Sequence, residues 1–126
     1  MTGPRFNRCL LLVEDDALVR DTVALMLEDE GYEVIEASDA RTALELVRAG
    51  LDAPVIVTDV DLRTGPSGAE LADAVHRMRP DLRIILITGR PPSLAGRECD
   101  EREAILPKPF ASEALSRLVR EMSARR

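Results

Sequence analysis

Short apolar runs alternate with helical patterns along this chain, and no other feature restricts the fold as strongly. The runs have the length of strands and lie at residues 8–13, 32–37, 54–58, 83–88 and 103–107. Apolar residues also recur at steps of three and four, as on one face of a helix, within 19–26, 40–47, 71–78 and 115–122. Strands that are apolar throughout and joined by helices indicate a parallel sheet covered on both faces.

The length of the chain limits this architecture to one unit. With 126 residues and 45% apolar composition, it can bury a core without disulfides or metals, yet it is too short for two ordinary domains. We therefore expect a single domain over residues 1–126. Its class is α/β, with a doubly wound, five-stranded parallel sheet in the flavodoxin-like order 2-1-3-4-5.

One connection departs from the regular pattern. The stretch "GRPPSLAGRECDERE", residues 89–103, contains two prolines and an internal glycine but few apolar side chains. Proline disfavours helix at the residue before it, and glycine costs about 1 kcal/mol relative to alanine inside a helix. We expect the fourth helix of the usual doubly wound pattern to be short or degenerate.

Charge and composition exclude several kinds of partner. The net charge of −6 argues against a surface for nucleic acid and against attraction to anionic membranes. No apolar run approaches the roughly 18 residues that span a bilayer, and the first residues lack the apolar centre of a signal peptide. Cys9 and Cys99 do not form a disulfide framework or a zinc motif. We expect a cytoplasmic protein.

Functional residues of a doubly wound sheet lie at the carboxyl ends of its strands, near the point where the strand order reverses. Here those ends carry acids, a hydroxyl and a lysine. They are Glu14 and Asp15 after the first strand, Asp59 and Asp61 after the third, Thr88 after the fourth and Lys108 after the fifth. Because these ends meet at one edge of the sheet, the side chains are predicted to converge.

Such a cluster implies a particular chemistry. Neighbouring carboxylates repel one another by several kcal/mol, so the site is expected to bind a hard divalent cation, Mg²⁺. Lys108 can neutralise one carboxylate and suits an incoming phosphoryl group, to which Thr88 offers a hydroxyl. With its charge screened, Asp59 is a candidate nucleophile toward phosphorus.

Four segments, "LLVEDDALVR", "VIVTDVDL", "ILITG" and "LPKPF", resemble in order and spacing the receiver domain of two-component response regulators, over about residues 6–123. The resemblance implies a phosphorelay switch that catalyses only its own aspartyl phosphorylation and dephosphorylation. Its partners would be a sensor histidine kinase or phosphotransfer protein and an unidentified downstream protein. Carried over by position, Glu14 and Asp15 would be the acidic metal pair, and Asp59 would be the phosphoacceptor. Asp61 would bind the metal through its backbone carbonyl, and Thr88 would be the switch hydroxyl. Lys108 would be the phosphate-binding lysine, with a cis bond to Pro109.

The sequence departs from the family pattern near the site. Ile105 stands where an aromatic switch residue is usual, three positions before the lysine. Arg63 stands where proline is usual, four positions after the acceptor, and Gly68 comes one residue late. We expect a remodelled loop after Asp59 and no Tyr/Thr relay.

Two other functions are compatible with parts of the sequence. "DVDLRTG" has the nucleophile-x-acid spacing of haloacid dehalogenase-type phosphatases, although that family places its nucleophile on the first strand. A degenerate receiver that only binds protein is the other alternative. His76 is predicted to face solvent on the third helix rather than to carry a phosphoryl group. Because no output domain follows residue 126, we expect a readout through protein contacts, or a chain that is part of a larger regulator.

Overall fold

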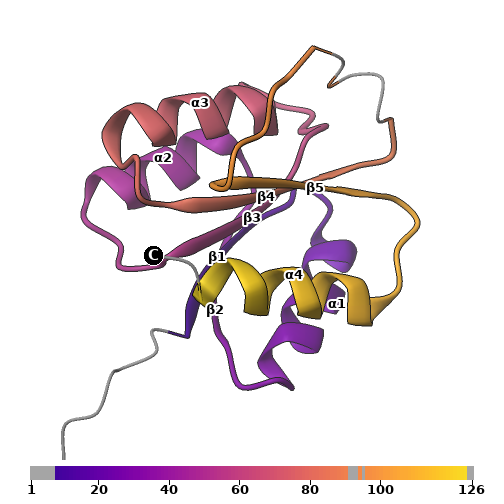
Figure 1. The fold of residues 1–126 in the computed structure, drawn as a ribbon. Helices are drawn as coiled ribbons and strands as arrows, with labels where there is room; N and C mark the ends of the chain where they lie inside the picture. Colours follow the sequence, from indigo (N-terminus) through magenta and orange to yellow (C-terminus); the bar gives the residue numbers. More distant parts are fainter. Residues whose placement is uncertain (1–7, 91–93, 95, 125–126) are drawn as a thin grey trace, which may run out of the picture.

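The computed structural model describes residues 8–90, 94 and 96–124. Strands and helices alternate as the apolar pattern predicts (Figure 1). The strands are β1 (Cys9–Val13), β2 (Glu33–Ala37), β3 (Val55–Asp59), β4 (Arg83–Thr88) and β5 (Glu103–Pro107). The helices are α1 (Ala17–Glu28), α2 (Ala40–Arg48), α3 (Gly68–Met78) and α4 (Ser112–Ala124). No helix in these described residues is both long and apolar enough to cross a membrane.

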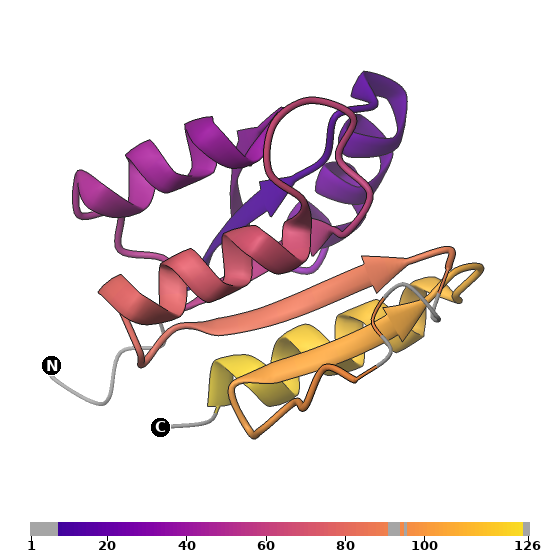
Figure 2. The same cartoon turned by 90° about the horizontal axis from the view of Figure 1, so that it is seen from above.

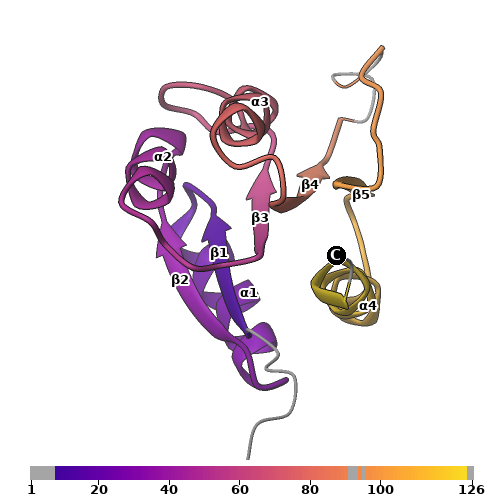
Figure 3. The ribbon, with the colours of Figure 1, turned by 60° about the vertical axis from the view of Figure 1, so that its left-hand side comes forward.

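The strands form one parallel sheet in the order β2-β1-β3-β4-β5, which confirms the predicted topology. Helices α2 and α3 cover one face and α1 and α4 cover the other (Figure 3). The central strands β3 and β4 are buried at every residue. Burial on both faces is the reason that the runs Val55–Val57 and Ile84–Ile87 within these strands are apolar without alternation.

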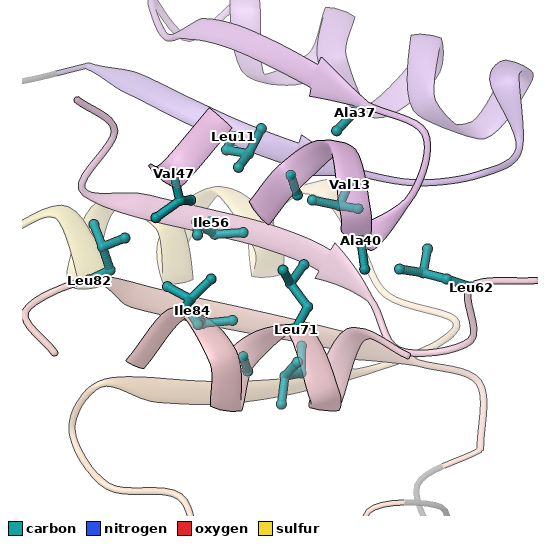
Figure 4. Packing of buried hydrophobic residues seen from close by; sticks show 14 of the residues in the cluster. Leu11, Val13, Ala37, Ala40, Val47, Ile56, Leu62, Leu71, Leu82 and Ile84 are labelled. Atoms are coloured by element: carbon teal, nitrogen blue, oxygen red, sulfur yellow. The ribbon is translucent and has the colours of Figure 1, made fainter. Parts of the chain in front are cut away.

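The sheet separates two apolar cores. In the first, Leu11, Ile56 and Ile84 on the sheet pack against Val47 of α2 and Leu71 of α3 (Figure 4). In the second, alternate strand residues pack against α1 and α4. Because β1, β2, β3 and β4 contribute to both cores, their positions in the sheet are fixed from both sides, and so are the points at which they end.

The segment between β4 and β5 runs along the sheet edge beside β5 (Figure 2). Its described residues, 89–90, 94 and 96–102, contain no α-helix, in agreement with the predicted degenerate fourth helix. Leu94 is buried and joins the core that α2 and α3 cover. The two prolines named above lie outside the described residues.

The prediction that His76 faces solvent is wrong. Its side chain is only 12% exposed, with Nδ1 3.4 Å from a carboxylate oxygen of Glu103. Arg97 also binds Glu103, with Nη2 at 2.7 Å, and reaches Asp73 on α3 at 2.9 Å. These side chains help to line a pocket of about 510 Å³ beside Glu103, the first residue of β5. The irregular segment before β5 encloses His76, and the helical pattern of α3 alone does not reveal that contact.

Candidate functional site

Three carboxylates meet at the carboxyl ends of β1 and β3. Glu14, Asp15 and Asp59 each offer an oxygen, and these oxygens all lie within 4.8 Å of one another. Glu14 and Asp59 are buried and Asp15 is half-buried. The predicted acidic cluster is therefore assembled by neighbouring strands that end at the same edge of the sheet.

Lys108 provides the opposite charge. Its Nζ lies 3.1 Å from Oδ1 of Asp59. The lysine is positioned by its own backbone, because its N–H donates to the carbonyl oxygen of Thr88 at 2.8 Å. The peptide bond between Lys108 and Pro109 is cis, as the resemblance implied.

Thr88 ends β4 with its side chain fully buried. Its Oγ1 accepts a hydrogen bond from the N–H of Arg90 at 2.9 Å. In the sheet, Asp59 lies beside Ile87, so Thr88 is one residue further along the neighbouring strand than the acid. The hydroxyl therefore lies at the same edge of the sheet as Asp59 and Lys108.

Burial and neighbouring charge shift the three acids in different directions. Burial raises the pKa of Glu14, and the charge of Asp59 adds to this effect. Burial likewise raises the pKa of Asp59, although Lys108 offsets part of the shift. For Asp15, the hydrogen bonds from the N–H of Arg63 and with Glu14, together with the charge of Arg63, outweigh partial burial, so its pKa lies below the ordinary value. Burial therefore acts most strongly on Glu14 and Asp59.

The turn after β1 is held by contacts from α1. Asp16 caps this helix, with Oδ1 accepting from the N–H groups of Leu18 and Val19. Arg20, one turn into the helix, donates from Nη1 to the carbonyl oxygen of Glu14 at 2.8 Å. Arg20 was not among the predicted site residues. Arg20 lies one helical turn after the capping residue Asp16, so its long side chain can extend back to the turn before the helix.

The loop after β3 and the segment after β4 each bring one further arginine to the site. The N–H of Arg63 donates to Oδ2 of Asp15 at 3.0 Å. Arg90, which follows Thr88-Gly89, places Nη2 3.1 Å from Oδ1 of Asp61. The Asp61 side chain therefore pairs with an arginine at the rim of the site. Its predicted role as a carbonyl ligand concerns its backbone and stays a prediction.

The donor set suits a divalent cation. All three clustered groups are carboxylates, which are the ligands that Mg²⁺ prefers in proteins. Oδ1 of Asp59 is buried, and the ammonium of Lys108 lies 3.1 Å from it. A carboxylate oxygen has more than one lone pair, so Asp59 can face Lys108 and still contribute to a cation site. Burial raises the pKa values of Glu14 and Asp59, and a bound cation would stabilise their charged forms.

Comparison with known proteins identifies the family. A family model described as the response regulator receiver domain matches residues 10–120. The chain belongs to the response regulator receiver domain family. The receiver domain is 32% identical to sensor kinase CckA of Brucella abortus over 116 residues, 90% of this chain and 12% of that protein. It is 33% identical to the transcriptional regulatory protein YrkP of Bacillus subtilis over 113 residues, 84% of this chain and 45% of that protein.

Solved structures agree with this assignment. The receiver domain superimposes on a response regulator receiver protein from Sinorhizobium medicae with a TM-score of 0.83, at 25% identity, covering 94% of this chain and 96% of that one. It matches response regulator TrrA of Thermotoga maritima, in complex with Mg²⁺ and BeF, with a TM-score of 0.80, at 25% identity, covering 91% and 98%. The receiver domain spans at most half the length of the first curated relatives that it matches.

The raised pKa of Asp59 gives a stability prediction for the metal-free receiver domain. Folding disfavours the charged carboxylate, so Asp59→Asn is expected to raise the free energy of unfolding by about 1 kcal/mol at neutral pH, or several degrees in Tm. Below the ordinary pKa of 3.8 the parent carboxyl is protonated in both states, so the gain disappears. Thermal unfolding in EDTA from pH 3 to 7 measures the difference. A variant less stable than the parent at pH 7 would contradict this sign.

Proposed function

We propose that the protein is the phosphoacceptor switch of a two-component phosphorelay and that Asp59 receives the phosphoryl group. One observation carries the proposal. The carboxylate of Asp59 ends a buried strand between an ammonium group 3.1 Å away and two further carboxylates that complete a cation-binding set. Membership of the receiver domain family supports the same reading.

In the proposed reaction, an oxygen of Asp59 attacks the phosphorus of a phosphohistidine on the donor protein. The oxygen–phosphorus bond forms as the phosphorus–nitrogen bond breaks, and the departing imidazole takes a proton from solvent. Lys108 stabilises the charge on the transferring oxygens. Glu14, Asp15, Asp59 and the backbone carbonyl of Asp61 would hold Mg²⁺, which adds positive charge opposite those oxygens when bound. The similar protein TrrA was solved in complex with Mg²⁺, which supports a magnesium site here.

Phosphorylation would act through the neighbouring strand ends. The acyl phosphate carries a charge of about −1.5 to −2, which attracts Thr88 and Lys108. The Thr88 hydroxyl already accepts from the N–H of Arg90, so its own proton is available to a phosphoryl oxygen. Movement of Thr88 would then shift Arg90 and the segment that follows. The side chain of Ile105 cannot donate or accept a hydrogen bond. The response is therefore proposed to run from Thr88 to Arg90 and the segment after β4, and not through an aromatic switch.

The proposal extends to the context of the switch. We assign the whole of residues 1–126 to one receiver domain and infer a cytoplasmic location, where a histidine kinase has access to ATP. The donor would be a sensor histidine kinase or a phosphotransfer protein, and the similarity to the kinase CckA supports that class. The output would be a protein contact, without nucleic acid or membrane binding by this domain.

Incubation with acetyl phosphate and Mg²⁺, followed by intact mass measurement, tests the assignment. We expect the mass of one phosphoryl group to be added to the parent and to be absent from Asp59→Asn. Sustained turnover of a phosphomonoester would instead favour the phosphatase. No addition from any donor, with partner binding unchanged in Asp59→Ala, would favour a degenerate receiver.

A further inference from the structure

Arg63 makes two contacts with one oxygen of the acidic cluster. Its backbone N–H donates to Oδ2 of Asp15 at 3.0 Å, and its Nε lies 3.6 Å from the same oxygen. A proline, the residue usual at this position in the family, has neither an N–H nor a charge and could make neither contact. The loop after β3 therefore gives this chain an additional cation at Asp15.

Two cationic side chains contact different acids of the cluster. Lys108 lies against Asp59 and Arg63 lies against Asp15. A divalent cation bound by the cluster must share Asp15 with Arg63, and two cations competing for one carboxylate weaken each other's binding.

Arg63 is also free to change its partner. Its side chain is 82% exposed, while its backbone is anchored to Asp15 through the N–H. The anchored loop thus keeps the guanidinium close to the cluster, in which oxygens of Asp15 and Asp59 lie within 4.8 Å of each other. A phosphoryl group on Asp59 would add oxygens at this place, and arginine binds phosphoryl oxygens in a bidentate manner.

We propose that Arg63 is a mobile counter-cation of the site, which competes with Mg²⁺ for Asp15 in the resting protein and contacts the phosphoryl group once Asp59 carries it. The second half rests on the function proposed above. The consequence is a pair of effects with opposite signs. Arg63 weakens binding of the metal alone and strengthens binding of a phosphoryl group together with the metal.

Arg63→Gln tests the proposal, because glutamine keeps the backbone N–H and removes the charge. Titration calorimetry with Mg²⁺ alone is expected to give about two- to five-fold tighter binding than in the parent. Titration with beryllofluoride at saturating Mg²⁺ is expected to give binding weaker by a similar factor. Arg41→Gln is the matched control, since Arg41 on α2 approaches Gly65 of the same loop and its removal changes the net charge equally.

The outcomes separate this proposal from a structural role and from the proposed function. If Arg63→Gln only disturbs the loop, binding of Mg²⁺ and binding of beryllofluoride should both become weaker. If its effects equal those of Arg41→Gln, they come from the change in net charge and not from the position of Arg63. Either result overturns the proposal. Arg63→Lys should restore both affinities toward the parent values. If the parent accepts no phosphoryl group but Arg63→Gln still tightens Mg²⁺ binding, the proposed function fails while the competition of Arg63 with Mg²⁺ for Asp15 stands.

Discussion

Asp15→Asn is expected to weaken Mg²⁺ binding at least about tenfold. Asp15 supplies one of three carboxylate oxygens within 4.8 Å of one another, and it is the most exposed of the three acids. An amide keeps the shape of the side chain but removes the charge, and the affinity of a hard cation depends strongly on the number of charged ligands. Titration calorimetry with the metal-free protein measures the change. The same variant should take up phosphoryl groups from acetyl phosphate much more slowly at moderate Mg²⁺ concentration.

The adjacent residue provides a matched control. Asp16→Asn changes the net charge equally and lies one position away, but Asp16 is a helix cap whose Oδ1 accepts from two backbone N–H groups. Asparagine caps helices about as well as aspartate, so stability should change little. We expect Mg²⁺ binding close to that of the parent. Equal Mg²⁺ affinity in Asp15→Asn and the parent would show that the acidic pair is wrongly assigned.

The fold could be predicted because its strands are buried on both faces. β3 and β4 contain no position that faces water along their length, so their apolar runs cannot be confused with a half-exposed strand. The position of the site could be predicted by the same reasoning. A polar residue directly after such a strand must lie at the edge of the sheet, and the four relevant strands end together, which brings Asp59 and Lys108 to 3.1 Å.

Contacts made by long, charged side chains could not be predicted in the same way. Arg20 reaches the carbonyl oxygen of Glu14, and Arg63 turns back to Asp15 across 48 positions of sequence. Neither contact has a periodic signature, because an arginine side chain can reach many partners from one backbone position. His76 shows the converse error. Its surroundings depend on Glu103 at the start of β5 and on Arg97, which lies on the segment without regular pattern before that strand.

The late glycine of the loop gives the last prediction, since Gly68→Ala should cost about 3 kcal/mol of unfolding free energy. A Cβ on Gly68 would meet the backbone carbonyl oxygen of Asp59 more closely than real Cβ atoms allow, and would lie 2.9 Å from Cα of Val60. Both neighbours are backbone, so no side-chain rotation can relieve the overlap. The N–H of Gly68 also donates to the carbonyl oxygen of Val60 at 2.9 Å, which fixes the approach. Thermal unfolding should show a Tm lower by roughly 10–20 °C.

Gly50→Ala separates this overlap from the general cost of replacing a glycine. Gly50 has a φ of +91°, and a Cβ there would have no neighbour within 4 Å, so the variant should lose only about 1 kcal/mol through backbone strain. Because Gly68 presses on the acceptor residue, Gly68→Ala should also slow phosphorylation by acetyl phosphate at temperatures where it remains folded, whereas Gly50→Ala should not. Equal Tm values for the two variants would show that the start of α3 can move away from Asp59, and the close packing of the loop against the acceptor would then not be required.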